Sequence, residues 1–208
     1  MRSVRIIVWA LVLALAVATA GFSQQSTRPT NLASYGYRVL TNARINLYMD
    51  NWGRGYVFDG NKKLWFRIPE VQVLNRIQPA YAKVSNTMAL IYAADIPVVY
   101  DTSRPNDSPW VYNNEVRSPR NPWYSFSRSR DANWVAQAND NLALAAATNW
   151  ITVYDYTLHR WVNVERGADD STGDLPRNFV LTPTTVTAKS LNGPFFVYTL
   201  GSGRWTSR

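Results

Sequence analysis

The feature that most constrains this chain is an aromatic pair that recurs four times. In the segment "TVYDYTLHRWVNV" (152–164), Tyr154 precedes an aspartate and Trp161 lies seven residues further on. Both rings sit in short runs of alternating apolar residues. The other copies pair an aromatic residue with a tryptophan in the same way: Phe58 with Trp65, Tyr100 with Trp110, and Tyr198 with Trp205. Self-similarity of this kind indicates a protein built from repeated structural units.

Two independent series of residues give the same repeat length. The four tryptophans are separated by 45, 51 and 44 residues. A second aromatic series, which precedes a polar turn in each unit, is separated by 44, 53 and 45 residues; its members are Tyr37, Tyr81, Trp134 and Phe179. The agreement predicts four units of about 47 residues. Together they make one repeat domain over 34–208, with units of roughly 34–78, 79–130, 131–175 and 176–208.

Each unit contains four short segments with the pattern of β-strands. The first carries the leading aromatic residue, the second alternates after a polar turn, the third ends at the repeated aromatic residue, and the fourth contains the tryptophan. Such runs, rich in Val, Ile, Tyr and Trp and bounded by Asn, Asp and Gly, predict antiparallel strands joined by turns. The alanine-rich stretch 141–148 holds the second-strand position of its unit, so we predict a strand there rather than a helix.

Four strands in about 45 residues are typical of one blade of a β-propeller. The pattern Tyr-Asp, five residues, then Trp resembles the kelch blade, in which the two rings pack between blades. The resemblance spans Tyr37 to Trp205, although the double glycine of kelch blades is absent. It implies an all-β chain of four four-stranded blades. These blades either close as a small ring similar to hemopexin-type domains or form half of a larger ring completed by dimerisation.

The first residues are typical of an export signal. Arg2 and Arg5 precede an apolar run over 6–17 and a small-residue exit that ends at Ala20. This run is short for a membrane span, which needs about 20 apolar residues. We therefore predict a signal peptide over 1–20 and a polar leader over 21–33, with a secreted or periplasmic location and no transmembrane span after cleavage. An uncleaved anchor is the alternative.

Composition narrows the class of partner. The chain has no cysteine, so disulfides and thiolate zinc sites are excluded. It carries 22 basic and 14 acidic residues, and only four of the basic residues are lysines. Arginine favours bidentate and stacking contacts over diffuse charge. Because no compact basic run is present, we predict an extracellular or envelope protein or an anionic glycan as partner rather than a nucleic acid, with a homo-oligomer as a further option.

Signatures of catalysis are weak. The single histidine, His159, falls in a turn whose equivalent positions hold Lys63, Ser108 and Gly203, so we predict no catalytic residue. The acidic loop 165–174 lacks the alternating ligands of a calcium loop, so we predict neither a metal site nor a cofactor.

Three aspartates follow the repeat. Asp59, Asp101 and Asp155 each come directly after the repeated aromatic residue, whereas the fourth unit has Thr199. Aspartate side chains commonly accept hydrogen bonds from the backbone of a turn. A turn-forming or a blade-linking hydrogen bond therefore explains these residues without a ligand.

Two departures from the repeat are our candidate binding surfaces. Unit 1 has an enlarged hairpin turn, and unit 2 is followed by a long connection rich in arginine and aromatic residues. Rings interleaved with guanidinium groups can stack on sugars and clamp carboxylates or sulfates. A stiff loop packed on the blade edge is the alternative. The candidate ligand-binding residues are Trp52, Arg54, Arg120, Trp123, Tyr124, Arg128 and Arg130.

The eight rings of the repeated pairs are assigned to blade packing instead. The sequence as a whole predicts an exported, non-enzymatic binding or protein-interaction module. Two alternatives stay open: a secreted propeller-type hydrolase or lyase acting on polysaccharide, and a structural subunit that oligomerises through exposed sheet edges.

Overall fold

Four antiparallel β-sheets make up the described part of the chain. The computed structural model describes residues 24–30, 37–50, 54–68, 82–93, 96–116, 135–147, 150–164, 178–189 and 195–207. Every element with described bounds is a β-strand, and the sheets follow one another in chain order. The prediction of an all-β chain of four four-stranded propeller blades is confirmed. Within these residues, no helix has the length and apolar character needed to cross a membrane.

The four strands of each blade form an up-and-down meander in which each strand pairs with the next strand along the chain. Blade 1 contains β2 (Tyr37–Thr41), β3 (Ile45–Met49), β4 (Gly55–Asp59) and β5 (Leu64–Arg67). Blade 2 contains β6 (Lys83–Val84), β7 (Met88–Ala93), β8 (Ile96–Asp101) and β9 (Trp110–Tyr112). Blade 3 contains β10 (Val135–Ala138), β11 (Leu142–Ala147), β12 (Trp150–Asp155) and β13 (Arg160–Asn163). Blade 4 contains β14 (Asn178–Leu181), β15 (Thr185–Lys189), β16 (Phe195–Thr199) and β17 (Trp205–Ser207).

Polar side chains close the turns between the first and second strands. In blade 3, the side-chain oxygen of Asn139 accepts hydrogen bonds from the backbone amides of Asn141 and Leu142, at 2.8 and 2.9 Å. In blade 1, Asn42 accepts in the same way from the amide of Arg44, at 3.1 Å. These side chains hold the backbone in a turn at the end of each first strand. The alanine-rich stretch after Asn141 forms strand β11, as its position in the repeat predicts.

Part of the segment 21–33 belongs to blade 1. Residues Gln24–Gln25 form β1, which pairs antiparallel with β5 as a fifth strand. Nearby, the guanidinium of Arg28 lies 5.8 Å from the centre of the Tyr48 ring. The described residues of this segment therefore cover the outer side of the first blade, a contact that the polar composition of the segment does not predict.

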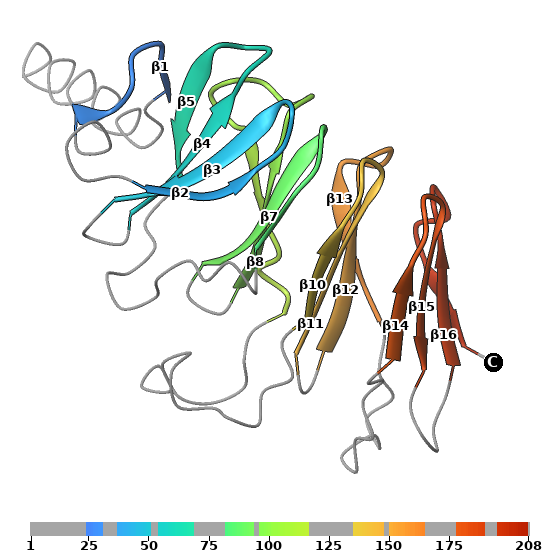
Figure 1. Cartoon of the computed structure of the whole chain (residues 1–208). Coiled ribbons are helices and arrows are strands. Elements are labelled where there is room, and N and C mark those ends of the chain that lie inside the picture. Colours follow the sequence, from blue (N-terminus) through green and yellow to red (C-terminus); the bar gives the residue numbers. More distant parts are fainter. Residues whose placement is uncertain are drawn as a thin grey trace, which may run out of the picture.

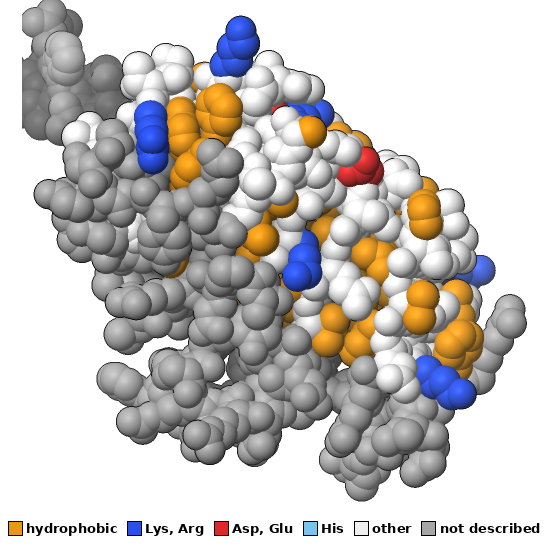
Figure 2. Space-filling view, viewed as in Figure 1, with side chains coloured by type: hydrophobic (Ala, Val, Ile, Leu, Met, Phe, Trp, Pro, Cys, Tyr) orange, Lys and Arg blue, Asp and Glu red, His pale blue; other side chains and the backbone are white. Residues whose placement is uncertain are grey.

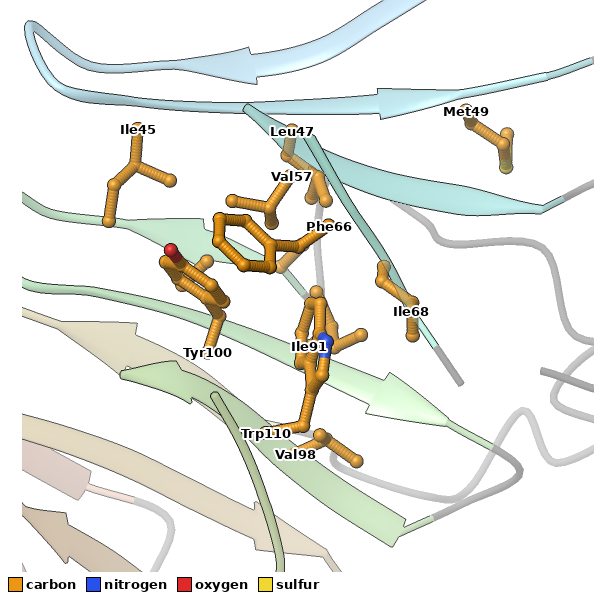
Figure 3. Packing of buried hydrophobic residues seen from close by; sticks show 12 residues of the cluster. Ile45, Leu47, Met49, Val57, Phe66, Ile68, Ile91, Val98, Tyr100 and Trp110 are labelled. Carbon is orange, nitrogen blue, oxygen red and sulfur yellow. The ribbon is translucent and has the colours of Figure 1, made fainter. Parts of the chain in front are cut away.

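The blades stand side by side in a row, with blades 1 and 4 at its opposite ends (Figure 1). The C-terminus lies at the blade 4 end. The hydrophobic core is divided into layers between neighbouring blades. Figure 3 shows the first layer, in which Phe66 of blade 1 packs beside Tyr100 of blade 2, with 5.1 Å between ring centres. Two further clusters fill the spaces between blades 2 and 3 and between blades 3 and 4.

Alternation along the strands gives each blade two distinct faces. The back face, which carries the aromatic pair, packs on the preceding blade: Tyr100 and Trp110 belong to the layer formed with Ile45 and Leu47. The front face packs on the following blade and is apolar in blades 1 to 3. Successive side chains of a strand point to opposite faces, so one short strand supplies both layers.

The front face of blade 4 is more polar than the front faces of the other blades. Thr185 pairs with Thr199 and Leu142 pairs with Asp155, so Thr185 and Thr187 take the positions of Leu142 and Leu144. Both leucines have no exposed area, whereas both threonines are half-buried. Terminal units of repeat proteins commonly carry such a polar outer face, because no further unit covers it. Blade 4 therefore has the surface of an end cap.

Candidate functional site

The structure brings the two members of each repeated aromatic pair together on neighbouring strands. Tyr154 lies directly opposite Trp161, with 5.4 Å between ring centres, and the other three pairs have centre distances between 4.9 and 5.5 Å. The tryptophans of the last two blades also reach the preceding blade. The indole N–H of Trp161 donates to the Val111 carbonyl, and that of Trp205 donates to the Val162 carbonyl, both at 3.0 Å.

Each tyrosine of these pairs is linked to an aspartate of the preceding blade. The hydroxyl of Tyr100 donates to Asp59 Oδ2 at 3.0 Å, and that of Tyr198 donates to Asp155 Oδ2 at 2.6 Å. Between them, Tyr154 donates to Asp101 Oδ2 at 2.7 Å. All three aspartates have no exposed area. We call these three contacts the Asp-Tyr links; they join blade 1 to 2, 2 to 3 and 3 to 4.

The second oxygen of each aspartate organises the turn that follows its strand. Asp155 Oδ1 accepts from the Thr157 and Leu158 amides and from the Thr157 hydroxyl. Asp59 Oδ1 accepts from the amides of Asn61 and Lys62. Turn formation and blade linking, the two explanations that the sequence left open for these aspartates, therefore both hold.

The protonation of the linked tyrosines follows from their surroundings. Burial raises the pKa of Tyr154 far above its usual value, and the hydrogen bond to the Asp101 carboxylate and its negative charge raise it further. The pKa values of Tyr100 and Tyr198 are raised for the same reasons. These hydroxyls therefore stay protonated and donate to the carboxylates, so they cannot serve as general bases near neutral pH.

The Asp-Tyr links do not extend past either end of the row. Blade 1 has Phe58 at the tyrosine position, which has no hydroxyl, and blade 4 has Thr199 at the aspartate position. Three links therefore join four blades, and the residues that a fourth link of this kind would need are missing. Blades 1 and 4 have the residues of terminal units in this respect.

His159 lies at the link between blades 2 and 3. Its Nδ1 atom is 2.8 Å from Asp101 Oδ2 and 3.2 Å from the Ser103 hydroxyl. Its backbone has a positive φ of 52°, like Lys63 at 56° and Gly203 at 67°, which occupy the same turn position in blades 1 and 4. Histidine, aspartate and serine meet here, but the serine contacts the same ring nitrogen as the aspartate. In a catalytic triad, one ring nitrogen of the histidine contacts the nucleophile and the other contacts the carboxylate. The arrangement at His159 is therefore not a catalytic triad.

Of the candidate ligand-binding residues, the structure describes only Arg54. Its exposed side chain lies at the end of the turn between β3 and β4 of blade 1, where its amide donates to Asp50 Oδ1 at 2.9 Å and its carbonyl accepts from the Asp50 amide at 3.0 Å. These bonds fix the backbone beside the enlarged turn. The other candidates lie outside the described residues: Trp52, Arg120, Trp123, Tyr124, Arg128 and Arg130.

The described residues contain no group of three or more His, Asp or Glu side chains that could hold a metal ion. The acidic loop 165–174 lies outside them. Figure 2 shows Lys and Arg side chains spread along one face of the row, with little acidic surface between them. Among the described acidic residues, Asp59, Asp101 and Asp155 are buried between blades, whereas Asp107, Glu115 and Asp140 are exposed.

No protein-family description and no curated protein sequence matches this chain. Among solved structures, it is similar to the computationally designed Ika8 protein, with 12% identity and a TM-score of 0.44 over 81% of this chain and 47% of that one. It is also similar to a fragment of HIRA, with 14% identity and a TM-score of 0.42 over 83% of this chain and 52% of that one. BamB from Moraxella catarrhalis has 14% identity and a TM-score of 0.34 over 81% of this chain and 47% of its own. The chain thus spans about half the length of these structures. Since all three TM-scores are below 0.5, the blade assignment rests on sheet order and interblade contacts.

Proposed function

We propose that this chain is an exported, non-enzymatic binding module, in which the blades carry loops that bind an anionic glycan or another envelope protein. The observation that carries the proposal is how the repeated polar residues are used. Asp59, Asp101 and Asp155 are buried and hydrogen-bonded between blades. Because these repeated residues hold the sheets together, we assign ligand binding to residues that differ between the repeats.

The loops that depart from the repeat supply the chemistry for such a ligand. The turn of blade 1 carries Trp52 and Arg54, and the connection after blade 2 carries Trp123, Tyr124 and several arginines. Guanidinium groups form paired hydrogen bonds with carboxylates and sulfates, and aromatic rings stack on sugar rings. The excess of arginine over lysine supports the same ligand class. The export pattern of residues 1–20 supports a partner outside the cytoplasm.

A glycan array tests the loops directly. The wild-type chain and a Trp123→Ala, Arg128→Ala variant are compared on anionic and neutral glycans, with Arg67→Ala as a control for the loss of one exposed charge on a blade. We expect the loop variant to lose binding to anionic glycans and Arg67→Ala to keep it. Equal binding by all three proteins, or binding by none, removes the glycan from the proposal.

Two further measurements separate this proposal from its rivals. Turnover of a polysaccharide that survives both chelation and His159→Ala would favour a hydrolase or lyase, with carboxylates as the reacting groups. Sequencing the N-terminus of the chain isolated from its native host tests export: an N-terminus near Gly21 supports it, and an intact Met1 contradicts cleavage. The Tyr and Trp spacing supports grouping the units with kelch-like blades, although the double glycine is missing.

A further inference from the structure

A pocket opens between the outer strands of blades 3 and 4. Its volume is about 390 Å³, and it lies between the ends of β13 and β17. The lining comes from both blades: Val162, Asn163, Val164, Phe196 and residues 203–207. We call it the outer-strand pocket. The equivalent places between the other blades show why it is open here.

A repeated backbone hydrogen bond identifies the equivalent position in each blade. Three residues after the tryptophan, an amide donates to the carbonyl that lies three residues before the paired aromatic residue. In blades 2 and 3 these bonds join Asn113 to Pro97 and Val164 to Ile151, each at 3.0 Å. Blade 1 has the same bond from Ile68, also at 3.0 Å. Ile68, Asn113 and Val164 are therefore equivalent.

Between blades 2 and 3 the equivalent space is closed by a polar bridge. The Asn113 side-chain amide donates to the Thr152 hydroxyl at 2.8 Å and to the Asn163 side-chain oxygen at 2.6 Å. Asn113 is only 2% exposed, as is Ile68 between blades 1 and 2. At both of these interfaces a buried side chain fills the gap between the outer strands.

Between blades 3 and 4 the residues of this bridge are replaced. Val164 stands in place of Asn113, Phe196 in place of Thr152, and Ser207 in place of Asn163. Val164 and Phe196 are half-buried and Ser207 is exposed. A valine and a serine cannot reach across as the asparagine does. A hollow is left between the outer strands, and its lining combines apolar residues such as Val164 and Phe196 with polar residues such as Asn163 and Thr206.

Two arginines give the pocket a positive rim. Arg204 lines it, and the Arg160 guanidinium lies beside Gly203, where an added β-carbon would be 2.7 Å from Nη2. Both arginines are exposed. The ion pairs found among the described residues involve Arg44 and His159, and neither of these two arginines. Guanidinium groups that form none of the ion pairs of the described residues, beside a hollow with apolar residues in its lining, suit a ligand with one apolar and one anionic group.

The strand edges favour an extended peptide over a sugar. β17 is the last strand of its sheet, and in blade 1 the equivalent strand β5 already pairs with an added strand, through Gln25 opposite Trp65. An extended peptide can add to β17 in the same way, because main-chain hydrogen bonds at a sheet edge need no particular sequence. The indole N–H of Trp205 already donates to Val162, so it is not available to a sugar hydroxyl.

We propose that the outer-strand pocket binds an extended acidic peptide of a partner protein. The peptide adds as a strand beside β17, places an apolar side chain against Val164 and Phe196, and directs a carboxylate toward Arg204. This site uses none of the loop residues of the proposed function. Failure of one proposal therefore leaves the other standing.

Synthetic heptapeptides on a serine and threonine background test the proposal. One series carries a leucine and a glutamate two positions apart, because such side chains share a strand face. Matched series replace the glutamate by lysine or the leucine by serine. We expect the full chain to bind the leucine–glutamate series and neither matched series. Binding should also slow hydrogen exchange at the amides of β17.

Three variants locate the binding. Ser207→Tyr restores the size of Tyr112, its equivalent in blade 2, and closes the pocket; Arg204→Glu reverses the charge of its rim. Each should weaken peptide binding by about tenfold or more: Arg204→Glu removes a charge-assisted contact, and Ser207→Tyr fills the space that the apolar side chain of the peptide would occupy. Arg67→Glu makes the same charge change on blade 1 and should leave peptide binding unchanged. All three positions are exposed, so thermal unfolding should show folded variants.

The opposite outcomes overturn the proposal. It fails if no peptide series binds, if the lysine series binds as well as the glutamate series, or if Ser207→Tyr and Arg204→Glu bind like the wild type. Binding of polygalacturonate without any peptide, lost in Arg204→Glu, would replace the peptide by an anionic glycan.

Discussion

The hydroxyl of Tyr154 donates a 2.7 Å hydrogen bond to Asp101, a residue 53 positions earlier that belongs to the preceding blade. Asp101 has no exposed area, and its other oxygen accepts from the amide and hydroxyl of Ser103, at 2.8 and 2.6 Å. The carboxylate therefore fixes a turn and a blade interface together. A buried carboxylate needs such partners, because leaving one of its oxygens unsatisfied is costly.

Replacing Trp161 should destabilise the fold and leave ligand binding unchanged. Its ring packs on Tyr154, and its N–H reaches the Val111 carbonyl of blade 2. We expect Trp161→Ala to lower the free energy of unfolding by about 3 kcal/mol, as truncation of a packed aromatic residue does. Urea denaturation measures the change. Trp161→Phe keeps a ring without the N–H and should recover part of it. A stable Trp161→Ala variant that lost ligand binding would assign this pair to a binding site.

Acid should weaken the interface between blades 3 and 4. Burial raises the pKa of Asp155, but hydrogen bonds from Thr157, Tyr198 and Gly201 outweigh it and hold the pKa below its usual value. The unfolded chain then binds the proton more readily. The stabilisation is present above the unfolded pKa and is lost as the pH falls through the folded pKa.

Unfolding free energies measured between pH 7 and pH 3 test this linkage. We expect the wild-type value to fall below about pH 4, where an unfolded aspartate takes up its proton. Asp155→Asn should show a shallower fall, whereas Asp107→Asn, a change at an exposed aspartate, should follow the wild type. An unchanged slope in Asp155→Asn would show that this carboxyl contributes nothing to the acid response.

The polar front face of blade 4 should prevent self-association of the chain. Because Thr185 and Thr187 replace the leucines of blade 3, we expect the chain to be monomeric by size exclusion with light scattering. A Thr185→Leu, Thr187→Leu variant restores an apolar front face and should associate, whereas Thr27→Leu should not. A stable wild-type dimer would contradict the end-cap assignment and favour a larger ring completed by a second chain.

The sequence predicts the blades well because their signals are local. The alternating runs, the polar turns and the recurring spacing of ring pairs such as Tyr154 and Trp161 all lie within one unit. Even the alanine-rich strand β11 follows from its place in the repeat. These signals are recognisable in all four units, although the units differ in sequence, because each signal depends only on residue type and spacing.

Contacts between units are harder to predict. No local pattern shows that Tyr154 bonds the aspartate of the previous blade, and the pairing of Gln24–Gln25 with β5 comes from a segment with no strand pattern. The outer-strand pocket exists because Val164, Phe196 and Ser207 depart together from their equivalents. Comparing these positions among units 2, 3 and 4 could have indicated it, but only once the facing strands were known.

A double-mutant cycle between Tyr154 and Asp101 tests most directly whether the Asp-Tyr links hold the blades together. Unfolding free energies of Tyr154→Phe, Asp101→Ala and the double variant give the coupling energy. We predict about 1–3 kcal/mol, the range for a buried hydrogen bond to a charged group. The control cycle of Tyr154→Phe with Asp59→Ala, an aspartate of a different interface, should give a value near zero. A coupling near zero for Tyr154 and Asp101 as well would contradict the account.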